Sequence, residues 1–195
     1  MSNAILKGNA SGTGSVTLES PNTNSDRTIS LPDSNGTVMV SGNMPAFWAY
    51  ANALQSVSSA TQTLVNFGTK VFDTAGCFNN TGSTVTLNGL SVPAYAFCPN
   101  VAGYYQIITT FQPNTSVTRS SANIYKNGAI TLSGADITAT QLNSVQATGI
   151  IYLNGTGDYI QIYGLLIGTS PQIYGSAAAS NAAYTLFQAV LVRTA

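Results

Sequence analysis

Residues 148–166 read TGIIYLNGTGDYIQIYGLL, and this stretch decides the fold class. It is rich in β-branched and aromatic residues, and the pair Asn154-Gly155 stands near its middle. In the second half, Ile160 and Ile162 fall on one side of an extended chain. The other side carries Tyr159, Gln161 and Tyr163. An Asn-Gly pair between such runs is a strong hairpin signal, because both residues accept a positive φ. The stretch therefore predicts two β-strands joined by a turn.

The same pattern of strand-like runs and turn residues continues on both sides of that stretch. Two more Asn-Gly pairs, Asn88-Gly89 and Asn127-Gly128, lie inside apolar runs. The Ala-rich segments 51–60 and 175–183 are flanked by Ser, Asn and Gly, so we interpret them as a strand end and a loop rather than as helices. Many short strands with regular turns predict an antiparallel sandwich or barrel. The further strand-like runs are TLVNFGTKVF (63–72), STVTLNGLSV (83–92), GYYQIITTF (103–111), SANIYKNGAITL (121–132) and AAYTLFQAVLVR (182–193).

The charge count excludes several classes of function. Only 6% of the 195 residues are charged, with six basic residues against six acidic ones, and there is no histidine. Phosphate binding needs clustered Lys and Arg, so we expect no nucleic-acid partner. Without His the chain has no Ser-His-Asp or Cys-His nucleophile and no His-ligated zinc. No apolar run approaches the roughly 18–20 residues of a membrane span, so we expect no membrane insertion.

The N-terminal part differs from the rest of the chain. Residues 1–44 contain short alternating runs between Gly, Pro and Asn clusters, and they include no Phe, Tyr or Trp. Such a segment cannot build a core alone, so it must pack on copies of itself or on a partner, or stay loose. Aromatic residues begin at Phe47 and recur to the end. We therefore expect a β-rich stalk or attachment segment at 1–44 and a head domain at 45–195.

The candidate chemical groups do not form a catalytic set. Cys77 and Cys98 could pair with each other, but they do not have the spacing of a metal motif, and two small buried thiols are the favoured interpretation. The six acids show no local pairing on one strand face, although partners could meet through space in a glycosidase. We expect no catalytic residues, no metal site and no cofactor, and we expect that the protein is not an enzyme.

Several short motifs follow one another along the second part of the chain. The most specific are Tyr104-Tyr105 after Gly103, the hairpin Lys126-Asn127-Gly128 and the turn Gly157-Asp158. From about residue 46 onward the chain resembles the globular head domain of the C1q and tumour-necrosis-factor family. That resemblance implies an all-β antiparallel jelly-roll sandwich that assembles as a tight homotrimer. For the trimer interface we predict Tyr105, Phe111, Tyr163 and Phe187.

The sequence departs from the family pattern in three ways. The link before Phe97 is longer than usual and predicts an extra hairpin at Asn88-Gly89. Some relatives pair a Cys at the position of Cys98 with a later one, but this chain has no later Cys. No acidic cluster matches the family's occasional calcium site, so no metal is carried over.

The N-terminal segment resembles a different group of proteins. Leu31-Pro32-Asp33 and Gly36-Thr37-Val38 match a segment that recurs in bacteriophage tail-fibre and head-fibre proteins, where it precedes a trimeric tip domain. A stalk followed by a jelly-roll head is the layout of a virion fibre. The resemblance implies an external virion location, synthesis in the bacterial host cytoplasm, and attachment to other virion proteins through the stalk.

The sequence leaves three functions open. The first is a trimeric phage fibre whose head recognises the host surface, a polysaccharide or a protein. The second is a purely structural capsid or tail decoration without a receptor role, and the third is a fibre-borne polysaccharide depolymerase. For recognition we predict the small-residue-rich loop around 169–181, because loops on a rigid scaffold carry binding. Its candidate receptor-binding residues are Gln172, Tyr174 and Asn181.

Overall fold

The computed structural model describes most of the head and only short pieces of the N-terminal part. In the head it describes residues 44–138, 140, 142–175 and 184–195, and before them 11–14, 17, 22, 24–26, 28, 39, 40 and 42. The chain divides into two compact units, Met1–Gly36 and Thr37–Ala195. The predicted strands and fibre motifs of residues 1–44 lie mostly outside the described residues, so the stalk remains a prediction.

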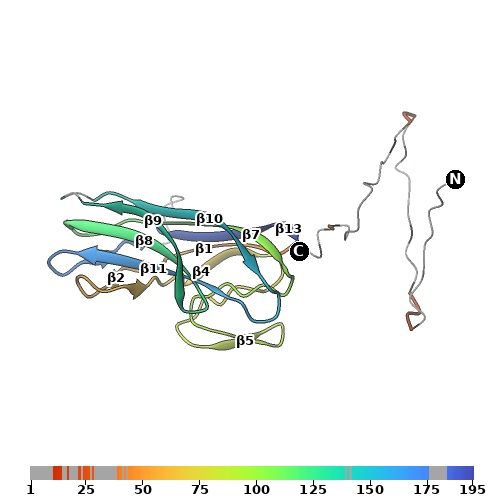
Figure 1. Ribbon diagram of the computed structural model, residues 1–195, viewed down its shortest axis with the longest axis horizontal. Coiled ribbons are helices and arrows are strands. Elements are labelled where there is room, and N and C mark those ends of the chain that lie inside the picture. The colour runs from red at the N-terminus through yellow and green to blue at the C-terminus, as the bar shows by residue number, and fades with distance from the viewer. Residues whose placement is uncertain are drawn as a thin grey trace. The chain divides into compact units, whose positions relative to one another are not determined.

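Two antiparallel sheets form the head (Figure 1). The five-stranded sheet has the order β10–β7–β13–β1–β4, and the four-stranded sheet has the order β3–β11–β8–β9. The first consists of β1 (Ala46–Tyr50), β4 (Thr69–Asp73), β7 (Gly103–Phe111), β10 (Val145–Leu153) and β13 (Leu186–Thr194). The second consists of β3 (Thr63–Leu64), β8 (Arg119–Lys126), β9 (Ala129–Ile137) and β11 (Ile160–Ile167). Two small pairs complete the head: β2 (Gln55–Ser56) with β12 (Gln172–Ile173), and β5 (Val85–Leu87) with β6 (Leu90–Val92). The predicted all-β antiparallel jelly roll is confirmed.

Two of the three Asn-Gly pairs make the predicted hairpins. Asn88 and Gly89 have φ of 50° and 77°, and Asn127 and Gly128 have φ of 53° and 78°, as a two-residue hairpin turn requires. The hairpin prediction at Asn154-Gly155 is wrong, because β10 and β11 belong to different sheets. There the Asn154 side chain accepts hydrogen bonds from the backbone N–H groups of Thr156 and Asp158, at 3.0 Å each, and shapes a longer crossover.

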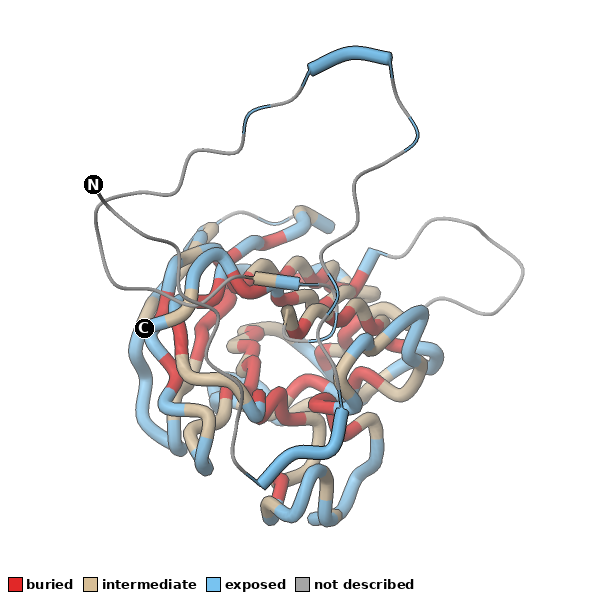
Figure 2. The backbone as a smooth tube through the Cα atoms, turned by 90° about the vertical axis from the view of Figure 1, so that its right-hand side faces the viewer, coloured by how far each residue is buried: buried red, intermediate tan, exposed pale blue. Residues whose placement is uncertain are grey.

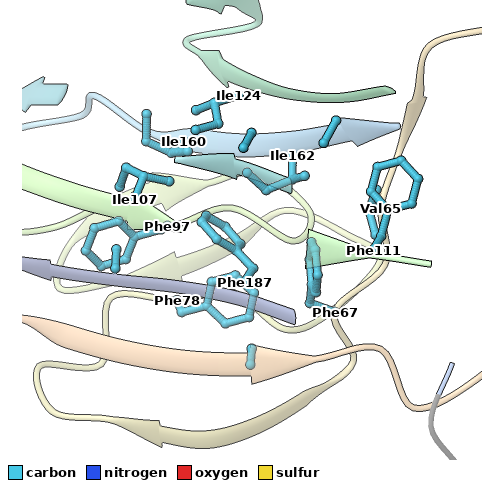
Figure 3. Packing of buried hydrophobic residues seen from close by; sticks show 14 of the residues in the cluster. Val65, Phe67, Phe78, Phe97, Ile107, Phe111, Ile124, Ile160, Ile162 and Phe187 are labelled. Atoms are coloured by element: carbon cyan, nitrogen blue, oxygen red, sulfur yellow. The ribbon is translucent and has the colours of Figure 1, made fainter. Parts of the chain in front are cut away.

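A cluster of phenylalanine rings fills the space between the two sheets (Figure 3). Phe47 stacks on Phe78 and Phe97 with ring centroids 4.5 and 4.7 Å apart, and it meets the edge of Phe187 at 4.8 Å. Ile124, from the four-stranded sheet, belongs to the same buried cluster. Along the strands, buried residues alternate with more exposed ones (Figure 2). One apolar core therefore holds the sheets together.

The structure corrects the predicted trimer interface. Tyr105, Phe111 and Phe187 are each 0% exposed within the single chain, so their side chains belong to the core and leave no surface for a neighbouring copy. The Tyr105 hydroxyl donates to the Val101 carbonyl at 2.7 Å, which satisfies its polar end inside the chain. Tyr163 differs, because it is partly exposed on the outer side of the four-stranded sheet.

The longer link predicted before Phe97 forms the β5–β6 hairpin, which has a small buried cluster of its own. Cys77 and Cys98 lie where this segment leaves and rejoins the core, and the Cys98 N–H donates to the Cys77 carbonyl at 2.9 Å. Both cysteines are buried and free, as predicted. Burial raises the pKa of the Cys98 thiol to about 11, so this thiol stays protonated at neutral pH.

Strand direction gives the head two distinct ends. β1 starts at Ala46 opposite Val190 and finishes at Tyr50 opposite Leu186. We call the end with Ala46 and the last residues of β13 the near end, because the chain enters the head there. The end with Tyr50, Leu186 and the β2–β12 pair is the far end; in Figure 1 β2 and the C-terminus mark opposite ends of the sandwich.

Candidate functional site

The outer side of the five-stranded sheet is almost free of charge. Strands β1, β7, β10 and β13 contain one charged residue, Arg193, and its guanidinium lies over the Tyr104 ring at 5.2 Å. The edge strand β4 adds only Lys70 and Asp73, which pair with each other at 3.3 Å. Strand alternation places every second side chain on this outer side. We call it the neutral face.

Large apolar side chains are exposed on the neutral face. Their exposed fractions range from 39% to 63%, although apolar side chains of this size are usually buried. They come from four strands that lie across the whole sheet, so they form a continuous surface rather than isolated exceptions. They are Phe72 (46%), Tyr104 (39%), Ile150 (63%), Tyr152 (41%) and Val190 (40%). An uncharged apolar sheet face of this kind is typical of a surface that another chain covers.

Sequence reasoning missed these residues for a clear reason. Tyr104 and Tyr105 are neighbours of the same type, but alternation sends one to the neutral face and the other into the core. The signal that could have found them is the lack of any charge in every second position of β7, β10 and β13. The free surface of a solvated sheet normally carries charged residues at such positions.

A pair of tyrosines marks the far end of the head. The rings of Tyr174 and Tyr184 meet edge to face with centroids 5.4 Å apart, and Tyr184 is 45% exposed. The backbone of Tyr174 is fixed on both sides. Its N–H donates to the Gln112 carbonyl at 2.8 Å, and its carbonyl accepts from the buried Thr185 hydroxyl at 2.6 Å. The scaffold therefore presents a fixed aromatic pair on either side of residues 176–183.

The predicted recognition residues fall into three situations. Tyr174 contributes an aromatic ring at the far end. The Gln172 side chain is held within the fold, because its carbonyl accepts from Asn114 at 3.1 Å and its amide donates to Ser56 at 3.4 Å. Asn181 lies outside the described residues. Tyr184 is the residue that the prediction missed, although it borders the same loop.

Gly175, next to Tyr174, lies close to another part of the backbone. A Cβ atom built on Gly175 would lie 2.0 Å from the carbonyl oxygen of Ala53, so only glycine allows this close approach of two backbones. The backbone of Gly175 therefore lies directly against that of Ala53, three residues after the end of β1.

The carboxylates of the head do not form a catalytic pair in the part that the structure describes. Asp73, Asp136 and Asp158 each bind a different cation: Lys70, Arg119 and Lys126, respectively. Lys126 of the last pair also donates to the Tyr152 carbonyl of β10 at 2.9 Å and lies over the Tyr152 ring at 5.6 Å. Among the described residues, no group of three or more His, Cys, Asp or Glu side chains could hold a metal ion. No helix within the described ranges is long and apolar enough to cross a membrane.

The comparisons with known proteins found matches in fold but not in sequence. No protein-family model matches the chain, and no curated protein sequence matches it. Among solved structures, the globular domain of zebrafish complement 1qA is similar with a TM-score of 0.51 and 15% identity, over 77% of this chain and 99% of that chain. Murine APRIL at pH 5.0 has a TM-score of 0.53 at 12% identity, over 76% of this chain and 99% of that chain. Eiger TNF from S. frugiperda has the same score and identity, over 78% of this chain and 95% of that chain. The head of this chain is therefore a C1q- and TNF-like jelly roll.

Proposed function

We propose that this chain is a bacteriophage virion fibre protein, a homotrimer whose head recognises the surface of the host cell. The proposal combines the C1q- and TNF-like head with the fibre-type sequence of the N-terminal segment. Other virion proteins hold the stalk, which leaves the head free to meet the host.

The observation that carries the proposal is the neutral face. Fully burying a large apolar side chain stabilises a complex by about 1.5–3 kcal/mol relative to leaving it exposed. Phe72, Ile150 and Val190 are each about half exposed, so each could contribute roughly half of that on association. With almost no charged group to desolvate, this gain is not offset by the cost of burying ions. A second copy of the chain offers an equally uncharged surface.

Recognition is expected at the far end. The chain enters the head at Ala46, so a stalk attached to a virion leaves the opposite end, with Tyr174 and Tyr184, facing outward. A trimer would present this aromatic pair three times. Linking several weak sites raises the apparent affinity by about 10²–10⁴ when all can bind together.

The chemistry of the far end fits an uncharged carbohydrate. Residues 169–185 contain no Lys, Arg, Asp or Glu. Aromatic rings stack on the C–H faces of sugars, while amides and hydroxyls read sugar hydroxyl groups. Tyr174 and Tyr184 supply the rings. A bacterial surface polysaccharide is therefore the preferred class of receptor.

The two other functions make different demands. A structural decoration protein needs the neutral face but no far-end binding. A depolymerase needs two carboxylates at one site, yet Asp73, Asp136 and Asp158 are engaged with separate cations. These pairings favour binding without turnover.

The test uses the full chain. We expect light scattering at micromolar concentration to give the mass of three chains, and an array of purified bacterial surface polysaccharides to show binding without release of shorter sugars. Tyr184→Ala should abolish array binding while the trimer persists. Ile130→Ala is the matched control, since Ile130 is 52% exposed on β9. A trimer that binds no polysaccharide or host cell would leave the decoration function, and release of oligosaccharides would favour the depolymerase.

A further inference from the structure

The three Asn-Gly pairs of the head differ in how the fold holds their asparagine side chains. In such a pair the glycine nitrogen can attack the side-chain amide carbon of the asparagine, because glycine has no side chain to block the approach. The attack closes a succinimide ring and expels ammonia, and water then opens the ring to aspartate or isoaspartate. A fold that ties the amide down opposes this reaction, and a fold that leaves the amide nitrogen free permits it.

The Asn88 amide is tied down by its nitrogen. This nitrogen donates to the carbonyls of Ala75 and Gly76 at 2.9 and 3.2 Å, and to the Cys77 sulfur at 3.6 Å. It is the atom that would leave as ammonia. Cyclisation at Asn88 must therefore break these bonds first, and the fold protects this pair.

The Asn127 amide is held at both of its polar atoms. Its nitrogen donates to the Asp158 carboxylate at 2.7 Å, and its oxygen accepts from the Tyr159 N–H at 2.9 Å. The bond to the carboxylate is charge-assisted and therefore stronger than one between neutral groups. The fold protects this pair as well.

Asn154 has the opposite arrangement. Its side-chain oxygen accepts from the N–H groups of Thr156 and Asp158 at 3.0 Å each. Among the described residues, no carbonyl or carboxylate holds its amide nitrogen in the way seen at Asn88 and Asn127. Asn154 is also exposed, so ammonia can leave directly into water.

The two bonds to the Asn154 oxygen favour the ring closure. The bond from Thr156 spans two residues, so it folds the side chain back over the Gly155 peptide. Attack by the Gly155 nitrogen turns the side-chain oxygen into an anion, and two N–H groups that already point at this oxygen stabilise the developing charge. Ring closure at Asn154 therefore keeps its hydrogen bonds, whereas at the other two pairs it breaks them.

We propose that Asn154 is the site at which the folded head deamidates itself. The Gly155 nitrogen gives its proton to solvent and bonds to the Asn154 amide carbon. The bond from that carbon to the amide nitrogen breaks, this nitrogen leaves as ammonia, and one water molecule opens the ring. Water is the only other reactant, and no atom is oxidised or reduced. The reaction depends neither on self-association nor on the proposed fibre function.

The product places a new carboxylate at the near end of the head. Leu153, just before Asn154, pairs with Gly103, which pairs with Thr194 at the end of β13. Asn154 and Asp158 each accept a hydrogen bond from the other's backbone N–H, so the new carboxylate lies beside that of Asp158. The formal net charge of the chain, which is zero, falls by one.

The first experiment follows the three sites in the folded full chain. The protein is kept at mildly alkaline pH, and peptide mass spectrometry measures the conversion of each asparagine over time. Asn154 should convert at least about 10-fold faster than Asn88 or Asn127, since one hydrogen bond that must break corresponds to about a factor of ten in rate. In urea the three sites should convert at similar rates, because each precedes a glycine. Asn35-Gly36 is scored separately, because it lies outside the described residues.

Equal rates at the three sites of the folded chain, or faster conversion of Asn88 or Asn127, overturn the proposal. Asn154→Ser gives a second readout by isoelectric focusing. The wild-type head should acquire one acidic form that accepts a methyl group from an isoaspartyl methyltransferase, and the variant should not. An acidic form that arises equally fast in Asn154→Ser places the modification elsewhere and overturns the assignment.

Asp158→Ala tests the physical reason for the difference. It removes the carboxylate that holds the Asn127 amide but keeps the backbone N–H that donates to Asn154. Asn127 should then convert faster, by about 10-fold or more, while Asn154 remains a fast site. If Asn127 stays slow although circular dichroism shows a folded variant, hydrogen bonding of the leaving nitrogen does not control the reaction, and the proposal is overturned. If this variant does not fold, the comparison of the three wild-type sites decides.

Discussion

The outer faces of the two sheets differ in how complete they are within one chain. On β8 of the four-stranded sheet a polar side chain is buried and paired: Asn123 is 3% exposed, and its amide donates to Gln62 and Ser121 at 3.3 Å each. Its edge carries the two-point ion pair of Arg119 with Asp136. The neutral face instead exposes apolar groups and leaves the Trp48 indole unsatisfied. The four-stranded sheet pairs these polar groups within one chain, whereas the neutral face leaves apolar side chains exposed and one indole N–H without a partner.

This difference separates two kinds of substitution. Residues of the core and of the four-stranded sheet should govern folding. Residues of the neutral face should govern association and have little effect on the folding of a single chain. Each prediction below tests this division, beginning with the largest effect.

The largest effect is expected for Phe187→Ala on β13. The Phe187 ring is fully buried against Phe47 and Phe67, with centroids 4.8 and 5.4 Å away. Truncating it should lower the free energy of unfolding by about 3–5 kcal/mol, measured by urea denaturation. Val190→Ala on the same strand should change unfolding by less than about 0.5 kcal/mol and weaken association instead. If Phe187→Ala dissociates a trimer whose chains stay as stable as before, Phe187 is an interface residue after all.

The second effect is expected for Asn123→Ala. The substitution removes two hydrogen bonds and leaves the buried Ser121 hydroxyl without this donor, while the partner oxygen of Gln62 belongs to an exposed residue. The free energy of unfolding should fall by about 1–2 kcal/mol. Gln106→Ala, an amide substitution on the exposed part of the neutral face, is the control and should not change unfolding. Equal losses of unfolding free energy in the two variants would mean that contacts within one chain hold the amide side chains of both faces.

The sequence could predict the strands and two of the turns, but not which side of each sheet faces the core. Local chemistry set the strands and the turns at Asn88-Gly89 and Asn127-Gly128, because φ preferences act within a few residues. It failed at Asn154-Gly155, where the path of the chain between two sheets decides the turn. Periodicity shows that Tyr104 and Tyr105 lie on opposite sides of β7, but it does not show which side is the core. That choice depends on how the sheets pack, which is a property of the whole fold.

The third effect concerns acid. Burial alone would raise the pKa of Asp158, but hydrogen bonds from Lys126, Asn127 and the Asn154 N–H, with the nearby Lys126 charge, lower it below its ordinary value of 3.8. A carboxyl group with a lowered folded-state pKa stabilises the fold fully above its unfolded pKa and loses that contribution as the pH falls through the folded-state value. The unfolding temperature should therefore drop more steeply below about pH 4 in the wild type than in Asp158→Asn.

Asp136→Asn is the control for this prediction. Its carboxylate also has a lowered pKa beside Arg119, but both side chains are nearly half exposed, so solvent screens the pair. It should change the acid profile less than Asp158→Asn does. The Lys126–Asp158 pair lies beside β10, because Lys126 donates to the Tyr152 carbonyl at 2.9 Å. The exposed side chains of Phe72, Ile150 and Val190 carry no titratable group, so association should stay constant over the pH range in which the chains remain folded. A trimer that dissociates before its chains unfold would place a titrating group in the contact.

The smallest expected effect is that of salt on association. An interface between charged surfaces weakens as salt screens it, since the Debye length falls from about 10 Å at 0.1 M to about 3 Å at 1 M. The strands of the neutral face contain Arg193 and the self-paired Lys70 and Asp73 as their charged residues. Arg193 lies over Tyr104, and Lys126 of β8, which pairs with Asp158, lies over Tyr152 at 5.6 Å. Apolar burial does not depend on this screening. The dissociation constant of the trimer should therefore change by less than about twofold between 0.1 M and 1 M sodium chloride, whereas a large increase with salt would show that charges hold the copies together.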